Sequence, residues 1–448
     1  MLAPLIPFLA IGVFLGLFAW VLFTKGDKNR LFIKYILLAY PLIATTILPG
    51  GAGYNNFDLI TILFFLIFYR PRHVHVKGGL LYLILFILLT AIGITACFLA
   101  ESITEETFRM FVEYFATFIF AKILIDEIIA DPAFFYEVIR CMQITVLVSI
   151  IFLGCQFIFG PQFSIARTLH GGVFMEDTAI RYPGFFQDPQ KFAQYLAASS
   201  FLFLIREPGT VKLPAKNYIL LVLTIISILY TGGRAALGGW ALGFLLIVIF
   251  GNSNLKLYAT LIAVVFFIVI YNFSDSFSVF NRHDNLSDSY EFRYGIWRDA
   301  FGIFLNNPFF GIAPGNYANY VSVHNPDQFW FVDNDFLYYD HPESGYLKWL
   351  TEFGAVGFLS VILLIVVPMI KGFFSYLKWK DTTFLLLIAA VISWMAGFYT
   401  VYSMGDVRIQ IMVTCFVCLL ITAYSRFDNV EEEDTDEELQ EEVNYAEN

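Results

Sequence analysis

Apolar runs of about 20 residues recur along almost the whole chain, and each is long enough to cross the hydrocarbon core of a bilayer as a helix. In lipid, only helices and closed barrels satisfy every backbone hydrogen bond. The chain has 448 residues, of which 58% are hydrophobic and 15% charged, so its polar surface is too small for a water-soluble globule. The sequence therefore predicts an all-α polytopic membrane protein.

We expect about thirteen transmembrane helices in a domain that covers residues 1–426. They are predicted near residues 2–23, 31–48, 56–69, 80–98, 108–125, 142–159, 190–205, 217–230, 235–250, 255–272, 346–370, 383–402 and 408–424. A polar, aromatic stretch, residues 273–345, precedes the eleventh helix. We expect it to be a long extracytoplasmic loop inserted in this domain and to carry the chemistry.

Lysine-rich loops alternate along the chain with loops that lack lysine. The positive-inside rule assigns the lysine-rich loops to the cytoplasm, which puts the N-terminus outside and the C-terminus inside. The external segments are then 160–189, 231–234, 273–345 and 403–407. The acidic residues 427–448 are predicted to form a disordered cytoplasmic tail.

The cations on the predicted external face are almost all arginine. They are Arg167, Arg181, Arg234, Arg282, Arg293, Arg298 and Arg408, with Lys191 and Lys348 as the lysine exceptions. A guanidinium group binds phosphate or carboxylate through two parallel hydrogen bonds. This pattern favours recognition of an anionic group.

A turn at residues 181–191 leads into one predicted helix. Two prolines and a glycine define the turn, and Arg181 and Lys191 bracket it with positive charge. We interpret Arg181 as a candidate ligand for an anion. The alternative is that Arg181 only anchors the turn at the level of the lipid headgroups.

A second turn, Thr231-Gly232-Gly233-Arg234, separates two predicted helices. Because Gly232 and Gly233 have no side chains, the backbone can approach a ligand closely there, and Arg234 begins the next helix. An arginine beside hydrocarbon costs about 2.5 to 3.5 kcal/mol on insertion scales. Arg234 is therefore a second candidate ligand, and snorkelling to the interface is the alternative.

The third cluster is a predicted amphipathic helix at residues 293–301, which a proline- and glycine-rich stretch ends at residues 307–317. Arg293 and Trp297 share one face of this helix, and Arg298 follows them. The pattern is typical of a helix at a membrane surface. Ligand binding and a purely structural interfacial role are both open.

The fourth cluster gathers imidazole and carboxylate groups before and within the eleventh predicted helix. Its members are His324, Asp333, Asp335, Asp340, His341, Glu343 and Glu352. Such groups at a membrane surface are candidates for a general base. Their spacing does not match a zinc motif, and a histidine in a loop also serves as an ordinary hydrogen-bonding group.

Residues 180–360 resemble the superfamily of O-antigen ligases, O-antigen polymerases and related exopolysaccharide polymerases of bacterial cell membranes. The family's R-x-x-G-x-F-x-N-P-N turn is matched by Arg181, Gly184, Phe186 and Pro189. Asp188 and Gln190 stand in place of its asparagines. Arg234 matches the arginine of a Ser-Arg-Gly-Ala helix start, with Gly233 in place of serine.

Two later motifs extend the resemblance. The R-x3-W helix and the N-P-x-x-G turn are matched by Arg293, Trp297, Asn307, Pro308, Gly311, Gly315 and Asn316. The closing motif H-N-x-Y-L-x4-E-x-G-x-x-G is matched by Tyr346, Leu347, Glu352, Gly354 and Gly357. His341 lies two residues before the family's histidine position, which Glu343 occupies. Both His341 and Glu343 remain candidates for the base, and the departure favours a polymerase over a ligase.

The resemblance implies a metal-independent, inverting glycosyltransferase without a cofactor. It would transfer a glycan from a polyprenyl (undecaprenyl) diphosphate carrier to an acceptor sugar hydroxyl on the extracytoplasmic face of the bacterial inner membrane, in O-antigen or exopolysaccharide polymerisation. Arg181, Arg234 and Arg293 would bind the diphosphate. Sugar or structural contacts are expected from Lys191, Trp297, Arg298, Tyr346 and Glu352. Besides donor, acceptor and membrane lipid, a chain-length regulator is a candidate partner, and no nucleic acid is expected.

The sequence leaves three alternatives open. An O-antigen ligase would transfer the glycan to lipid A-core. A transporter or flippase of lipid-linked sugars would place ionisable groups at mid-membrane in interrupted helices, whereas this chain places them at one mouth. A non-catalytic assembly subunit is the third alternative.

Overall fold

The computed structural model describes residues 5–425, apart from residues 47–53, 73, 75, 77, 162, 166–174, 177–178, 211, 275–276, 278, 281–285, 328, 333–334 and 340. The predicted tail, residues 427–448, lies outside the described residues. So do Arg167, Arg282, Asp333 and Asp340.

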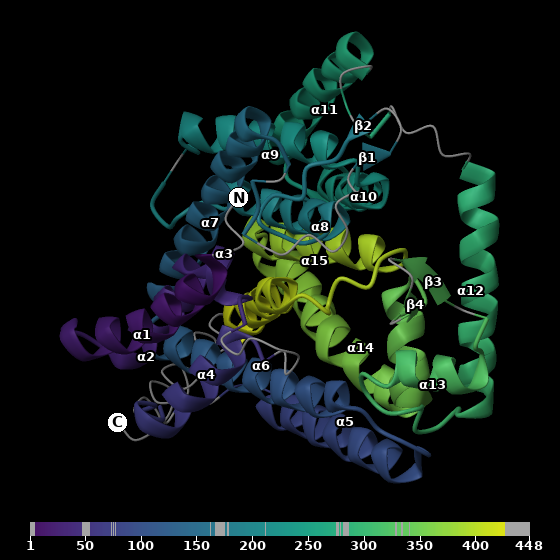
Figure 1. The fold of residues 1–448 in the computed structure, drawn as a ribbon. Coiled ribbons are helices and arrows are strands. Elements are labelled where there is room, and N and C mark those ends of the chain that lie inside the picture. Colours follow the sequence, from purple (N-terminus) through teal and green to yellow (C-terminus); the bar gives the residue numbers. More distant parts are fainter. Residues whose placement is uncertain are drawn as a thin grey trace, which may run out of the picture.

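The first part of the chain is helical and ends in a short hairpin (Figure 1). Its elements are α1 (Ile6–Phe23), α2 (Lys28–Leu38), α3 (Tyr40–Ile43), α4 (Asn56–Ile67), α5 (Gly79–Leu99), α6 (Glu105–Ala130), α7 (Phe134–Phe159), β1 (Met175–Glu176) and β2 (Ala179–Ile180). The strands β1 and β2 pair antiparallel, with Met175 opposite Ile180.

The second part contains longer helices and a second antiparallel hairpin, in which Phe329 of β3 lies opposite Tyr338 of β4. Its elements are α8 (Pro189–Ser199), the 3-10 turn η2 (Ser200–Leu204), α9 (Ala215–Thr231), α10 (Arg234–Phe250), α11 (Ser253–Phe273), α12 (Leu286–Asn306), α13 (Tyr317–His324), β3 (Phe329–Val332), β4 (Asp335–Tyr338), α14 (Gly345–Trp379), α15 (Thr382–Phe398) and a last helix, Val407–Ser425.

Each predicted span contains a helix, and the described part of the chain has four helices that are long and apolar enough to cross a membrane. These four are Gly79–Leu99, Phe134–Phe159, Gly345–Trp379 and Val407–Ser425. Shorter apolar helices of 10–17 residues accompany them, among them α9, α10 and α15. The expected all-α membrane protein is therefore confirmed, with two short hairpins as the exception.

Two predicted spans differ in detail from the helices observed. The segment 31–48 is divided, because Pro41 cannot donate a backbone hydrogen bond within a continuing helix and α3 restarts the helix at Tyr40. The eleventh segment extends to Trp379 and is interrupted at Gly354, whose φ of 64° and ψ of −173° are not helical. The break lies in the first third of α14.

The segment 273–345 contains regular structure within the predicted loop. It holds α12, α13 and the hairpin β3–β4. A small apolar cluster joins α12 to α13 through Ile296, Ala300 and Val321, and it includes Tyr339. This cluster fixes the segment against the start of α14, because Leu347 packs on it.

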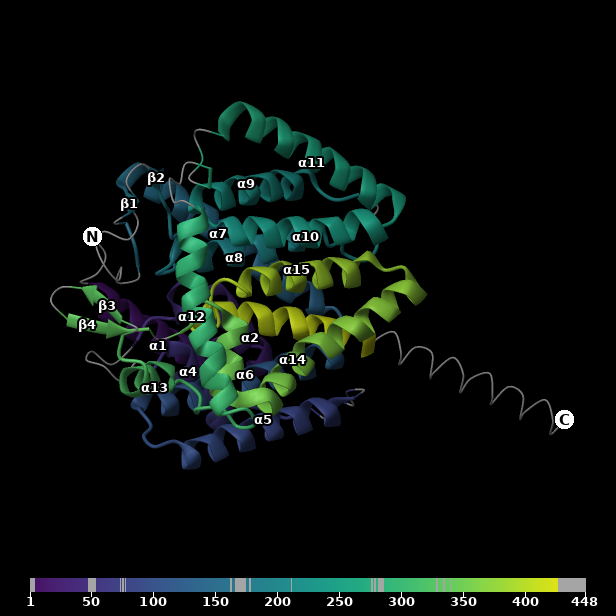
Figure 2. The same ribbon diagram turned by 90° about the vertical axis from the view of Figure 1, so that its right-hand side faces the viewer.

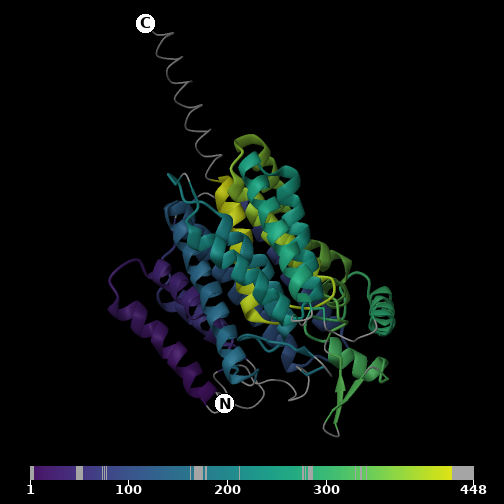
Figure 3. The ribbon, with the colours of Figure 1, turned by 90° about the horizontal axis from the view of Figure 1, so that it is seen from above.

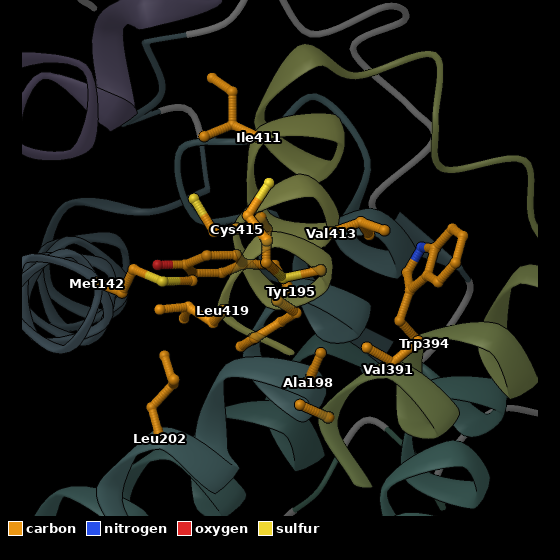
Figure 4. Packing of buried hydrophobic residues seen from close by; sticks show 14 of the residues in the cluster. Met142, Tyr195, Ala198, Leu202, Val391, Trp394, Ile411, Val413, Cys415 and Leu419 are labelled. Carbon is orange, nitrogen blue, oxygen red and sulfur yellow. The ribbon is translucent and has the colours of Figure 1, made fainter. Parts of the chain in front are cut away.

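The main core lies where α7, α8, α15 and the last helix meet (Figure 4). Met142, Tyr195, Trp394 and Cys415 are among its buried residues. Small residues bring helices close here as well: a side-chain carbon added at Gly239 of α10 would lie 2.2 Å from the carbonyl oxygen of Ser393 in α15. Cys415 and Cys418 are buried free thiols in this packing.

The polar elements gather at one end of the bundle. Figure 2 shows α9, α10 and α15 side by side, with both hairpins at one end of these helices and the α10–α11 and α14–α15 turns at the other. Helix α12 lies across this bundle instead of along it. Figure 3 shows the hairpin β3–β4 projecting away from the helices. The turns that carry the motif residues are therefore brought to one end.

Candidate functional site

Arg181 lies against the turn that precedes Arg234. Its Nε donates a hydrogen bond to the carbonyl oxygen of Thr231 at 3.2 Å, and the residue is 4% exposed. Gly232 ends α9 with a φ of 74°, and a side-chain carbon there would lie 2.9 Å from Arg181 Nε. Gly232 is therefore needed both for the left-handed backbone and for the room that Arg181 occupies.

Arg234 begins α10 at the same turn. Its Nε donates to the carbonyl oxygen of Val279 at 3.2 Å, and the residue is half-buried. The turn also contacts α8, because a side-chain carbon at Gly233 would lie 2.5 Å from Ala193 Cβ. Two motifs that are 50 residues apart in the chain thus bring Arg181 and Arg234 to one turn. We call this turn, with its two arginines, the arginine corner.

The turn before α8 is held by specific hydrogen bonds. Gln156 of α7 donates to the carbonyl oxygen of Gly184 at 2.8 Å and accepts from its amide at 2.9 Å. Asp188 caps α8 by accepting from the amide of Gln190 at 2.7 Å, and Pro189 occupies the first helical position. Asp188 therefore serves as a helix cap, which asparagine also does.

A buried ion pair connects this corner to the last helix. Arg408 binds Asp406 through Nε–Oδ1 at 2.8 Å and Nη2–Oδ2 at 2.6 Å, donates to the carbonyl oxygen of Phe185, and lies 4.3 Å from the centre of the Phe186 ring. Burial alone would raise the pKa of Asp406, but Arg408, and more weakly Lys191, hold that pKa below its usual range. Lys191 therefore adds positive charge in the surroundings of Asp406.

The third and fourth motifs form a second contact, at the break in α14. The amide of Ile312 donates to the carbonyl oxygen of Thr351 at 3.0 Å, and the amide of Ala355 donates to that of Pro308 at 2.7 Å. A side-chain carbon at Gly354 would lie 2.4 Å from the backbone of Phe309. The backbones at Pro308 and Gly354 touch each other here. This contact gives a structural reason for the presence of both motif residues.

Glu352 and Lys348 form a buried pair just before this break. Glu352 is 0% exposed, and Lys348 Nζ lies 3.0 Å from its Oε1. Lys348 Nζ also lies 4.8 Å from the centre of the Tyr402 ring. Tyr402 is itself buried at 5% exposure.

The two candidate bases lie together beside Tyr402. His341 Nε2 is 3.8 Å from Glu343 Oε1, and the His341 ring centre is 5.8 Å from that of Tyr402. Both side chains are partly exposed, at 22% and 26%. Glu343 has a φ of 50°, which is uncommon for a residue with a side chain. His341 thus lies next to Glu343, the residue that the register puts at the family's histidine position.

The other expected contacts separate into buried and exposed groups. Trp297 packs on Tyr399, with ring centres 5.3 Å apart, and Arg293 is half-buried one turn before it. Tyr346 donates its hydroxyl hydrogen to the carbonyl oxygen of Met395 at 2.8 Å, which is a structural contact between α14 and α15. Arg298 is exposed, and its Nε lies 3.4 Å from Oδ1 of Asp299.

The segment 399–406 and the polar groups that reach it do not stand out in the sequence. Tyr402 contacts Lys348, whereas Asp406 binds Arg408. Gln410 in the first turn of the last helix donates to Glu113 of α6. A carboxylate such as Glu113 inside an apolar helix is itself a signal of function. In the described part of the chain, no group of three or more His, Cys, Asp or Glu residues is arranged to hold a metal ion.

A family model described as O-antigen ligase matches residues 219–362. This segment of the chain is similar to that family. The matched segment includes Arg234, Arg293 and the closing motif, whereas Arg181 and Lys191 precede it. The resemblance to the O-antigen ligase and polymerase superfamily is thereby confirmed. No curated protein matches the chain. The match supports glycan transfer of the O-antigen ligase and polymerase type in general, a family that implies lipid-linked glycan substrates.

Proposed function

We propose that the protein polymerises a polysaccharide at the extracytoplasmic face of the bacterial inner membrane. It transfers a glycan from a polyprenyl diphosphate carrier to a hydroxyl group of an acceptor sugar. A polymerase is favoured over a ligase because Glu343 occupies the position at which the family places its histidine. The proposed topology has about thirteen spans, an external N-terminus, a cytoplasmic C-terminus and an external catalytic segment at residues 273–345.

One observation carries this proposal: two separate motifs place Arg181 and Arg234 on a single glycine turn. Arg181 bonds to the backbone of Thr231, and Arg234 begins the helix that follows the turn. A helix N-terminus and guanidinium groups both favour negative charge. A corner built in this way suits a diphosphate better than it suits a neutral sugar.

The proposed reaction needs two groups that act on opposite sides of the sugar. His341 or Glu343 takes the proton from the acceptor hydroxyl, whose oxygen forms the new bond to the anomeric carbon of the donor glycan. The bond from that carbon to the diphosphate oxygen breaks with inversion of configuration, and the polyprenyl diphosphate leaves with its electron pair. Arg181, Arg234 and Arg293 stabilise the charge that develops on the leaving oxygen.

The segment 399–406 supports this arrangement because it connects the two groups. Asp406 binds Arg408 beside the arginine corner, and Tyr402 contacts Lys348 beside the candidate bases. A reaction site requires its groups to be held in a fixed relative position. We assign Lys348, Glu352, Tyr402 and Asp406 to this positioning role.

The test uses purified protein and a polyprenyl diphosphate-linked repeat unit, with polymer measured by gel. Arg234→Lys keeps the charge but loses the two-pronged geometry, so we expect the rate to fall by about 10² or more. Arg140→Lys, at an exposed ion pair with Glu207, is the matched control and should act as wild type. A wild-type rate for Arg234→Lys would disprove diphosphate recognition, and a wild-type protein that makes no polymer would disprove the function.

A further inference from the structure

One amide side chain binds the segment 399–406, which connects α15 to the last helix. Gln410, in the first turn of the last helix, donates a side-chain N–H to the carbonyl oxygen of Met404 at 2.7 Å. Met404 lies midway between Tyr402 and Asp406 in the chain. Gln410 therefore binds the middle of the segment whose ends contact the two parts of the proposed site.

Helix α6 binds the same amide group. Gln410 Nε2 also donates to Glu113 Oε1, and Thr117 Oγ1 donates to Gln410 Oε1 at 3.0 Å. Glu113 and Thr117 lie one turn apart, so they share one face of α6. The amide thus uses both of its N–H donors and its carbonyl oxygen, and these partners fix its orientation. Figures 1 and 2 show the last helix, in yellow, between α15 and α6.

Helix packing alone does not explain this pair. Gln410 and Glu113 are each 1% exposed, and polar groups are costly inside the apolar helices of a membrane protein. Two apolar residues of similar shape would join α6 to the last helix at least as well. An amide can also hold a backbone carbonyl group, and Met404 supplies that carbonyl in a segment that is neither helix nor strand.

The ends of the segment contact the two groups on which the proposed reaction depends. At one end, the centre of the Tyr402 ring lies 5.8 Å from that of the candidate base His341. At the other end, Asp406 binds Arg408, which donates to the turn before α8 beside the arginine corner. A displacement of Met404 would therefore change the position of the candidate bases relative to the arginine corner.

We propose that Gln410 is a positioning residue of the transfer reaction. It holds Met404 at a fixed distance from Glu113 of α6, and so it fixes the candidate bases relative to the arginine corner. The inference rests on the proposed function and adds to it a residue that acts through Met404. A misplacement of about 1 Å far from the chemistry can lower a rate by about 10². Loss of the bond to Met404 should therefore lower kcat.

Gln410→Leu tests the proposal, and Gln143→Leu is its matched control. Gln143 of α7 also donates an amide hydrogen to a backbone carbonyl, that of Leu202 at 2.9 Å, but this bond joins α7 to η2 and does not involve the segment 399–406. With purified protein and a polyprenyl diphosphate-linked repeat unit, Gln410→Leu should lower kcat by about 10² and leave the KM for this donor unchanged. Gln143→Leu should keep the wild-type kcat even where its Tm falls.

An exchange of the two side chains separates the structural role from the positioning role. Gln410→Glu alone places two carboxylates against each other, so it should lower the Tm. Adding Glu113→Gln restores a donor and an acceptor between α6 and the last helix, and should return the Tm toward that of wild type. The exchanged pair still offers no N–H to the carbonyl group of Met404. Its kcat should therefore stay about 10² below that of wild type.

Hydrogen exchange of the backbone amides reports on the segment without turnover. Peptides that cover residues 399–406 should exchange faster in Gln410→Leu and in the exchanged pair than in wild type, and at the wild-type rate in Gln143→Leu. Unchanged exchange, a wild-type kcat in Gln410→Leu, or recovery of kcat together with Tm in the exchanged pair would overturn the positioning role. A wild-type protein that makes no polymer would refute the proposed function, whereas hydrogen exchange still decides whether Gln410 holds the segment.

Discussion

At the scale of single residues, the open choice is between His341 and Glu343 as the base. Their side chains lie 3.8 Å apart, so either of them can reach the same acceptor hydroxyl group. A positioned base contributes about 10² to 10⁴ in rate, which exceeds the effect of losing one hydrogen bond. The structure thus explains why sequence register alone does not choose between them.

We predict that either His341→Ala or Glu343→Gln abolishes polymer formation, and His341→Ala is the variant we favour. The rate should fall by about 10² or more, with little change in the KM for the donor. Single-turnover assays on purified protein, at matched membrane expression, measure this. If both variants turn over at near-normal rates, the base lies elsewhere or the site needs none.

A second prediction concerns Asp406, whose pKa is held low by Arg408 despite burial. A carboxylate with a lowered folded-state pKa adds stability above its unfolded pKa of about 3.9, and loses it as pH falls toward the folded value. The Tm of wild type in detergent should therefore fall as pH drops below about 4.5.

Asp406→Asn tests the same ion pair. It should be less stable at neutral pH by about 3 to 5 kcal/mol, because Arg408 is left buried without its partner. Its Tm should fall less steeply in acid than that of wild type. Equal acid slopes for the two proteins would show that Asp406 does not carry the effect.

At the scale of elements, the break in α14 is the feature that assembles the site. Gly354 has a φ of 64°, and its Cα faces the backbone of Phe309 so closely that no side chain fits. Glu352 lies just before the break in α14. The turn at Pro308 packs against the backbone just after it. An uninterrupted helix would not admit this turn.

We predict that Gly354→Ala destabilises the protein by at least about 1 to 3 kcal/mol and abolishes activity, because the left-handed backbone and the contact both oppose a side chain. Gly302→Ala is the matched control: Gly302 lies within α12 with no atom within 4 Å of the added carbon, so this change should be neutral or slightly stabilising. Thermal unfolding in detergent and polymer assays measure both. Wild-type behaviour of Gly354→Ala would show that the contact is not needed.

At the scale of the whole molecule, the site requires that the end with the two hairpins faces away from the cytoplasm. In a background without native cysteines, Asp327→Cys in the segment between α13 and β3 should react with an impermeant maleimide in intact spheroplasts. Ser253→Cys, at the α10–α11 turn, should react only after lysis. The reverse pattern would invert the topology and remove the proposed external site.

The sequence by itself determined the helical membrane architecture and the approximate helix ranges, because hydrophobic length and period are local properties. It also indicated the arginine turns, since Gly232 and Arg234 are neighbours in the chain. Only the tertiary structure decided that Arg181 lies across Gly232, that Pro308 meets Gly354, and that the segment 399–406 joins the two clusters. These contacts link residues far apart in sequence, and close packing between helices, which no local pattern encodes, sets them.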